Sequence, residues 1–212
     1  RLQQAVDRVF LREAVNQQRL MHQFTAHLAE ATGLSSVLQV LSEAIESGWK
    51  PQFAALFLYD MHRACYAPRV LGHTDTFPEV SFGRDGPLAP HMLERRESIY
   101  LYPDRSLPQH LSSEKEALKA LCPGLLIPVP GHGWLALGPK RSGMLYSSED
   151  LSTLESLASQ VAVALDKARL FTDLERRMVE VDALRLIGQA VNFTMDVDDL
   201  MELIYAQTSR VL

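Results

Sequence analysis

The chain has 212 residues, of which 47% are hydrophobic and 22% are charged. This length accommodates one domain of about 150 residues with additional helix, and the composition is typical of a globular protein. The formal net charge of −5 argues against a general nucleic-acid or anionic-membrane surface, because such surfaces need an excess of basic residues. The two cysteines, Cys65 and Cys122, are too few for a disulfide framework and indicate reduced thiols.

No segment of the sequence resembles a membrane helix or a signal peptide. No apolar run reaches the ~20 residues that a helix needs to span a bilayer. The first residues, Arg1 to Gln4, already fit a helical pattern. We therefore expect a piece of a longer cytoplasmic protein, with no direct membrane insertion by this segment.

The first 48 residues have the spacing of two helices. Apolar residues recur at helical intervals from Arg1 to about Glu30, and Gly33 interrupts them. The second pattern begins at Ser35 or Ser36, either of which is a suitable N-cap.

Short strands, turns and short helices follow the first two helices. Pro87 predicts the first position of one helix, and a capping box of Ser113 with Glu116 predicts the start of another. Pro128 lacks a backbone donor, which predicts a sheet edge or a bulge in its strand. The predicted strands cover residues 53–59, 65–71, 98–102, 125–129 and 134–137, and the last two form an antiparallel hairpin.

A long helix begins at a second capping box, Ser147 with Asp150. Its apolar stripe changes phase near Phe171 and then continues. A run this long has no means of burying its stripe within a compact domain, so we expect a homodimer through the terminal helices. The residues predicted to form this dimer and signalling helix are Leu154, Val161, Leu165, Ala168, Leu174 and Met178.

The beginning of the chain recurs near its end. Met21 and Phe24 align with Leu184 and Ile187, and the apolar pattern of the second helix recurs around Met201. This repetition indicates the start of a second copy of the domain, although any two amphipathic helices align in a similar way.

The order of elements resembles the GAF domain family. The paired strands around Ile127 and Trp134, the link through Lys140 and Tyr146, and the helix after Asp150 carry the likeness. It covers Met21 to Leu174 and implies an α+β fold, an α/β sandwich in which helices flank a central antiparallel sheet, with long N- and C-terminal signalling helices. We accordingly predict a linker helix over residues 1–20, a GAF domain over 21–174, and a linker helix with the start of a second repeat over 175–212.

The resemblance implies a small-ligand pocket under the loops of the sheet. The residues that we expect to line it are Tyr66, Phe82, His91, Tyr100 and Trp134. The alternative for each aromatic residue is a place in the core, because strands bury aromatic side chains in any case. A pocket filled by Trp134, Phe82 and Met92 would favour a domain that binds nothing.

The specialised ligands of the family are not expected. Cyclic-nucleotide-binding relatives carry an Asn-Lys pair, a Phe and an Asp-Glu pair, where this chain has Pro139-Lys140, Tyr146 and Asp150-Leu151. Lys140 and Asp150 are more simply a solvated lysine and a helix cap. Neither cysteine is followed closely by a histidine, as attachment of a bilin chromophore requires in the family. The seven histidines are dispersed, so no metal or cofactor is predicted, although an unknown small ligand is possible.

We therefore predict a non-catalytic regulatory sensor and dimerisation module of a signal-transduction protein such as a histidine kinase of a two-component system. It would relay a small-molecule or interdomain signal through a coiled-coil helix to neighbouring signalling domains. The alternative is a structural dimerisation and spacer domain without a ligand. A remote alternative is a thiol-dependent free methionine sulfoxide reductase that uses Cys65 and Cys122. No phosphate loop, zinc-protease motif or nucleophile elbow is present, so no catalytic residue is predicted.

Overall fold

The computed structural model describes residues 19–72, 77–101, 108–121 and 124–194, and side chains as far as residue 186. The chain divides into two compact units, Arg1–Arg169 and Leu170–Leu212. The predicted helix before residue 19, Cys122 and the predicted repeat around Met201 lie outside the described residues.

The first unit contains a six-stranded antiparallel sheet in the order β3-β2-β1-β6-β5-β4. The strands are β1 (Ala54–Asp60), β2 (Cys65–Val70), β3 (Phe82–Gly83), β4 (Ile99–Leu101), β5 (Gly124–Val129) and β6 (Gly133–Leu137). The predicted hairpin is confirmed as β5–β6, and the predicted antiparallel α+β fold is confirmed with it.

Both faces of the sheet are buried, because the strands alternate apolar side chains between two cores. In β1, Ala54 and Leu56 join one core, and Ala55 and Phe57 join the other. We call the first the helical core, since helices supply most of it. We call the second the aromatic core. Its members include Phe57, Tyr66, Phe82, Leu88, Met92, Leu111, Leu118 and Trp134.

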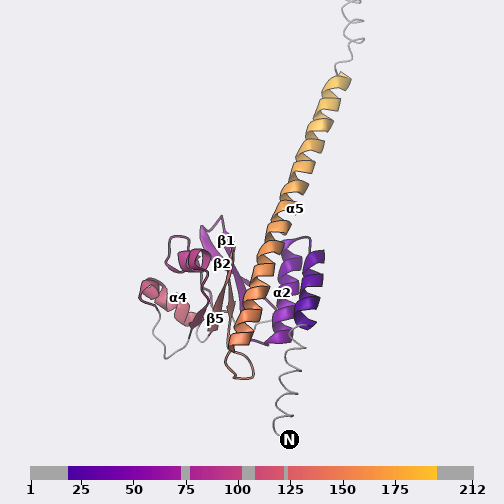
Figure 1. The fold of residues 1–212 in the computed structure, drawn as a ribbon. Helices are drawn as coiled ribbons and strands as arrows, with labels where there is room; N and C mark the ends of the chain where they lie inside the picture. Colours follow the sequence, from indigo (N-terminus) through magenta and orange to yellow (C-terminus); the bar gives the residue numbers. More distant parts are fainter. Residues whose placement is uncertain (1–18, 73–76, 102–107, 122–123, 195–212) are drawn as a thin grey trace, which may run out of the picture. The chain divides into compact units, whose positions relative to one another are not determined.

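Three helices cover the helical core: a helix over residues 19–30, α2 (Leu34–Gly48) and the first part of α5 (Ser148–Thr194). Figure 1 shows α2 and this part of α5 side by side against one face of the sheet. α2 begins after Gly33, which occupies the N-cap position and makes no side-chain hydrogen bond. The predicted serine N-cap is therefore wrong. Its apolar side nevertheless buries Val37, Leu41 and Ile45 as the spacing predicts.

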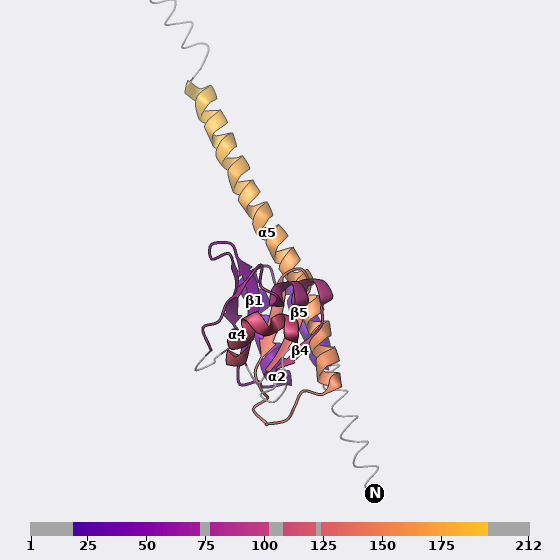
Figure 2. The same ribbon diagram turned by 90° about the vertical axis from the view of Figure 1, so that its left-hand side faces the viewer.

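Short helices cover the aromatic core on the opposite face (Figure 2). They are α3 (Leu88–Pro90), the π-helical turn η1 (His91–Arg95), the 3₁₀ segment η2 (Gln109–Glu114) and α4 (Lys115–Ala120). Pro87 stands immediately before α3, close to its predicted position. The predicted Ser113 capping box is wrong, because both its residues lie at or near the junction of η2 and α4 and no side chain caps α4.

Among the described residues, Pro128 is paired only with β6, so the predicted sheet edge is confirmed locally, although β5 is an interior strand and its regular register shows no bulge. β5 stands between β6 and β4, and Pro128 faces Trp134 of β6. The ladder from β5 to β4 covers only Gly124 to Leu126. Pro128 therefore lies beyond this ladder, where β4 needs no donor from it.

The first part of α5 buries its stripe within its own unit. Leu154, Val161 and Leu165 belong to the helical core, and Ala168 is buried with 4% of its surface exposed. The sequence argument that a compact domain could not bury this stripe is therefore wrong for these four residues, since each is buried within this unit. Leu174, by contrast, is exposed.

Candidate functional site

The aromatic core is the most distinctive cluster on the sheet. Trp134 stacks on Phe57 with 5.5 Å between ring centroids, and Phe82 and Tyr66 lie 5.6 and 4.8 Å from Trp134. β1, β2, β3 and β6 each supply one of these rings, because the register places Phe57 opposite Trp134 and Tyr66 opposite Phe82. Burial raises the pKa of the Tyr66 phenol, so it is neutral at physiological pH.

Two buried nitrogen atoms on this side of the sheet have no hydrogen-bond partner among the described residues. They are Nε1 of Trp134 and Nε2 of His91. Trp134 has no exposed surface, and His91 has 6%. A buried donor without a partner is costly, so such groups often mark the place of a water or ligand.

His91 contacts a second histidine across the short helices. Its Nδ1 lies 3.1 Å from Nε2 of His110, and the two rings stack with centroids 5.1 Å apart. Burial, reinforced by His110, lowers the pKa of His91, and Glu97 opposes this change. His91 is therefore a neutral imidazole near pH 7.

The structure brings together four of the five predicted pocket residues. Tyr66, Phe82 and Trp134 lie in the aromatic core, and His91 lies on η1, which packs against β5 and β6. Tyr100 packs instead on the helical core, because it pairs with Leu125 and points with it to the other face. Its predicted place in the same pocket is therefore wrong. Whether the other four contact a ligand stays a prediction.

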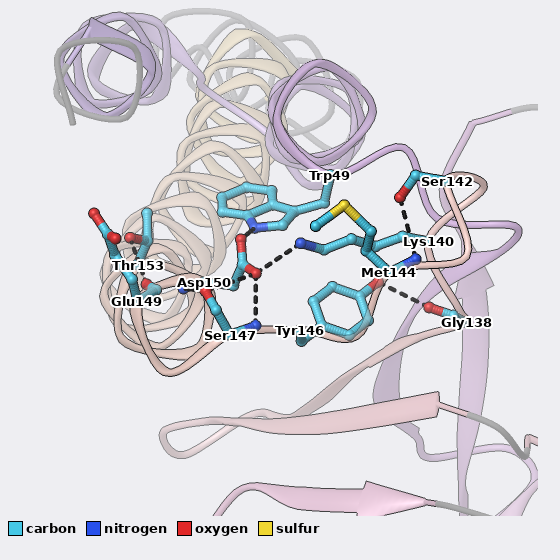
Figure 3. A network of polar contacts seen from close by, with 10 residues as sticks. All are labelled: Trp49, Gly138, Lys140, Ser142, Met144, Tyr146, Ser147, Glu149, Asp150 and Thr153. Atoms are coloured by element: carbon cyan, nitrogen blue, oxygen red, sulfur yellow. Dashed lines mark hydrogen bonds and ion pairs between the residues drawn. The ribbon is translucent and has the colours of Figure 1, made fainter. Parts of the chain in front are cut away.

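A second polar site joins the sheet to the start of α5 (Figure 3). Asp150 accepts hydrogen bonds from Trp49 Nε1 at 2.7 Å and from Lys140 Nζ at 2.6 Å. The predicted capping box is confirmed, because Ser147 N donates to Asp150 at 2.7 Å and Asp150 N donates to Ser147 Oγ at 3.1 Å. Nearby, Tyr146 donates its hydroxyl to the Gly138 carbonyl and lies beneath the Lys140 ammonium. We call Trp49, Lys140, Ser147 and Asp150 the α5 anchor.

Electrostatics favour the ionised form of Asp150. Burial alone would raise the pKa of its carboxyl group, but the hydrogen bonds from Lys140 and Ser147 outweigh burial and hold it below the ordinary value. The side chains of Lys140 and Asp150 are only 15% and 12% exposed. The expectation that Lys140 is a solvated lysine is therefore wrong.

Comparison with known families explains the arrangement of sheet and helices. The family model described as a GAF domain matches residues 31–166, which is more than half of the chain. The chain belongs to the GAF domain family. No curated protein matches the chain.

Solved structures share the fold of this GAF domain. A methyl-accepting chemotaxis protein, residues 122 to 287, is 17% identical with a TM-score of 0.54, over 69% of this chain and 97% of that one. A GAF domain/HD domain protein from Geobacter sulfurreducens is 23% identical with a TM-score of 0.52, over 68% and 98%. The GAF domain of a phosphoenolpyruvate-protein phosphotransferase from Coxiella burnetii is 18% identical with a TM-score of 0.52, over 74% and 96%. These likenesses establish the fold.

The positions compared above with the cyclic-nucleotide motif have structural partners in this GAF domain. Lys140 and Asp150 bind one another, and Tyr146 binds the backbone of Gly138. All three lie around the start of α5, where they stabilise the junction between the sheet and the helix. Sequence reasoning identified the cap but missed Trp49, whose indole N–H reaches Asp150 from the end of α2.

The remaining candidates for chemistry are sparse. Cys65 is a half-buried free thiol on β2, and Cys122 lies outside the described residues, so the thiol-reductase alternative is not tested. Within the described ranges, no group of three His, Cys, Asp or Glu side chains is placed to hold a metal ion. None of the described helices has the length and hydropathy needed to cross a bilayer.

Proposed function

We propose that the chain is a non-catalytic relay module that dimerises through the second part of α5 and carries a signal from its GAF domain to neighbouring signalling domains. The observation that carries this proposal is an uncovered apolar stripe on that helix. Phe171, Leu174, Met178 and Val181 follow one another at intervals of three, four and three residues, and all are exposed. This spacing is the heptad pattern of a helix that packs on another helix.

The exposed stripe and the buried stripe occupy different faces of a helical wheel. At about 100° per residue, Phe171 to Val181 are displaced by roughly a third of a turn from the row that contains Leu154, Val161 and Ala168. One face is therefore used by the sheet, and the other face is available for a second copy of the chain. This rotation agrees with the predicted change of phase near Phe171.

The aromatic core is the proposed point of input. The unpartnered Trp134 and His91 nitrogens suit a small polar ligand that accepts or shares a hydrogen bond. Such a ligand, or a neighbouring domain, would change the output only through different affinities for two arrangements of α5 in the dimer.

The stripe can be tested by its effect on oligomeric state. The double variant Leu174→Glu, Met178→Glu should be monomeric where the wild-type chain is dimeric, because it places charge in the helix seam. Val179→Glu is the matched control, since Val179 is 69% exposed on the same helix but outside the stripe, and Met178 is 68% exposed. Multi-angle light scattering measures the mass of each. A monomeric wild-type chain at its highest soluble concentration, or a double variant that stays dimeric, would contradict the proposal.

A second candidate function is a ligand-free dimerisation and spacer domain. The observation in its favour is the packing of Phe82, Met92 and Trp134, each of which is fully buried within the aromatic core. Native mass spectrometry of the freshly purified chain separates the two candidates. Extra mass that disappears on denaturation supports a sensor, and a dimer without extra mass supports the spacer.

A further inference from the structure

Two contacts fasten the short helices that cover the aromatic core to one another. His91 on η1 meets His110 on η2, with 3.1 Å between Nδ1 and Nε2. One turn earlier, the backbone N–H of Leu88 donates to Glu114 Oε2 at 2.9 Å. His110 and Glu114 both belong to η2. We call these four residues the clasp.

The clasp lies directly over buried apolar residues. Leu111 stands between His110 and Glu114 in η2 and is fully buried in the aromatic core, together with Leu88 and Met92. Separation of η2 from α3 and η1 would therefore uncover part of this core. Because His110 itself is exposed, its ring is accessible to solvent protons.

The histidine pair tolerates a limited number of protons. A neutral imidazole has one N–H and one lone pair, so contact between two ring nitrogens requires a donor on one ring and an acceptor on the other. When both rings are protonated, all four nitrogens carry hydrogen, and N–H faces N–H between two positive charges. The His91 Nε2–H would in addition have no acceptor among the described residues. The contact is incompatible with this state.

We propose that protons open the clasp through the His91–His110 pair: a second proton on the pair separates η2 from α3 and η1 and uncovers the aromatic core. The device does not depend on the dimer or on a ligand. Its effector is the proton itself, and its output is access to this face of the sheet.

The other charged groups around His91 do not replace this control. On its own side, Arg95 disfavours the charged imidazole and Glu97 favours it. The strands β5 and β6 pack against η1 and contain no titratable residue. Burial lowers the pKa of His91, so its neutral form is favoured in the closed clasp and acidification works against closure.

Protonation of Glu114 has the opposite effect on the clasp. Burial raises the pKa of its carboxyl group, and the hydrogen bond from Leu88 only partly opposes this change. A raised pKa means that protonation of Glu114 favours the folded state, so Glu114 does not open the clasp in acid. Opening is assigned to the histidines, below the ordinary histidine pKa of about 6.5.

Hydrogen–deuterium exchange with mass spectrometry tests the clasp in the full chain. Exchange is compared above and below about pH 6.5, after correction for the intrinsic rate. We expect η1 and η2 to lose protection on acidification, by about tenfold per pH unit for one coupled proton, while β5 and β6 stay protected. His110→Gln should weaken this dependence, because it removes the facing ring while His91 remains buried, and its exposed position means that the substitution leaves no cavity.

The matched control is His62→Gln, which replaces an exposed histidine in the β1–β2 turn and should retain the pH dependence. Equal protection of η1 and η2 at both pH values in the wild type would overturn the proposal. An acid-dependent loss of undiminished size in His110→Gln would also overturn it, because the facing ring would then contribute nothing. Far-UV circular dichroism at both pH values confirms that each variant is folded.

Discussion

Replacement of Asp150 by alanine should strongly destabilise the GAF domain. The carboxylate accepts hydrogen bonds from Trp49, Lys140 and both the backbone and the hydroxyl of Ser147. Its removal leaves the Lys140 ammonium without its anion at a site where the side chain is only 15% exposed. Breaking a buried ion pair by removal of one partner costs about 3–5 kcal/mol. This is a large part of the roughly 5–15 kcal/mol that stabilises a typical domain.

Urea unfolding at neutral pH measures this change in the free energy of unfolding. Asp166→Ala is the matched control, because Asp166 lies on the same helix with its side chain 70% exposed, and surface substitutions usually change stability by less than about 0.5 kcal/mol. The double variant Asp150→Ala, Lys140→Met should be more stable than Asp150→Ala, since it removes the unpaired charge. If Asp150→Ala lies within about 0.5 kcal/mol of the wild type, the anchor makes no net contribution and the reasoning fails.

The sign of the pH dependence provides a second check on the same residue. The pKa of Asp150 is lowered from its ordinary value of 3.8, so ionisation of its carboxyl group stabilises the folded state. Its contribution is fully present above the ordinary value and is lost as the pH falls through the lowered one. Asp150→Ala should therefore lose less stability in strong acid than the wild type does.

Two further substitutions test the packing. Leu165 lies in the helical core, so Leu165→Ala should destabilise the domain by about 2–5 kcal/mol in urea unfolding without changing the oligomeric mass. A variant that keeps its stability but becomes monomeric would show instead that Leu165 faces a partner. Gly133 has φ of +155°, so Gly133→Ala should cost about 1–3 kcal/mol in backbone strain. The added Cβ should raise this cost further, because it would clash with the Phe57 carbonyl oxygen. A thermal unfolding midpoint equal to that of the wild type would contradict this account.

Local sequence patterns predicted the elements whose signals are local. The apolar run of β1, the Pro130-Gly131 turn of the β5–β6 hairpin and the Ser147 cap each act over a few residues, and each is found in the structure. The short helices were harder to predict. α3 passes into a π-helical turn at His91, and the segment before α4 forms a 3₁₀ helix, so one helical period does not describe either of them.

The sites depend on distant contacts that periodicity does not encode. Trp49 and Asp150 are 101 positions apart, and His91 and His110 are 19 apart, yet each pair is in hydrogen-bond contact. The spacing of Leu154 and Leu165 identified an apolar stripe but could not tell whether a sheet or a second helix covers it. Tyr100 was assigned to the wrong face because a shift of one residue reverses the side of the sheet.

The distribution of contacts along α5 limits how a signal could reach its second part. The α5 anchor holds the start of the helix through buried, charge-assisted bonds, which resist rearrangement. Further along, the contacts are more exposed: Gln160 accepts from Thr25, Asp166 pairs with His132, and Lys167 donates to the Ala29 carbonyl. Exposed polar contacts contribute little net stability, so they exchange at low cost. This part of α5 is therefore held mainly by the buried side chains of Val161 and Leu165 in the helical core, and a signal carried by a change of helix packing would have to disturb that core.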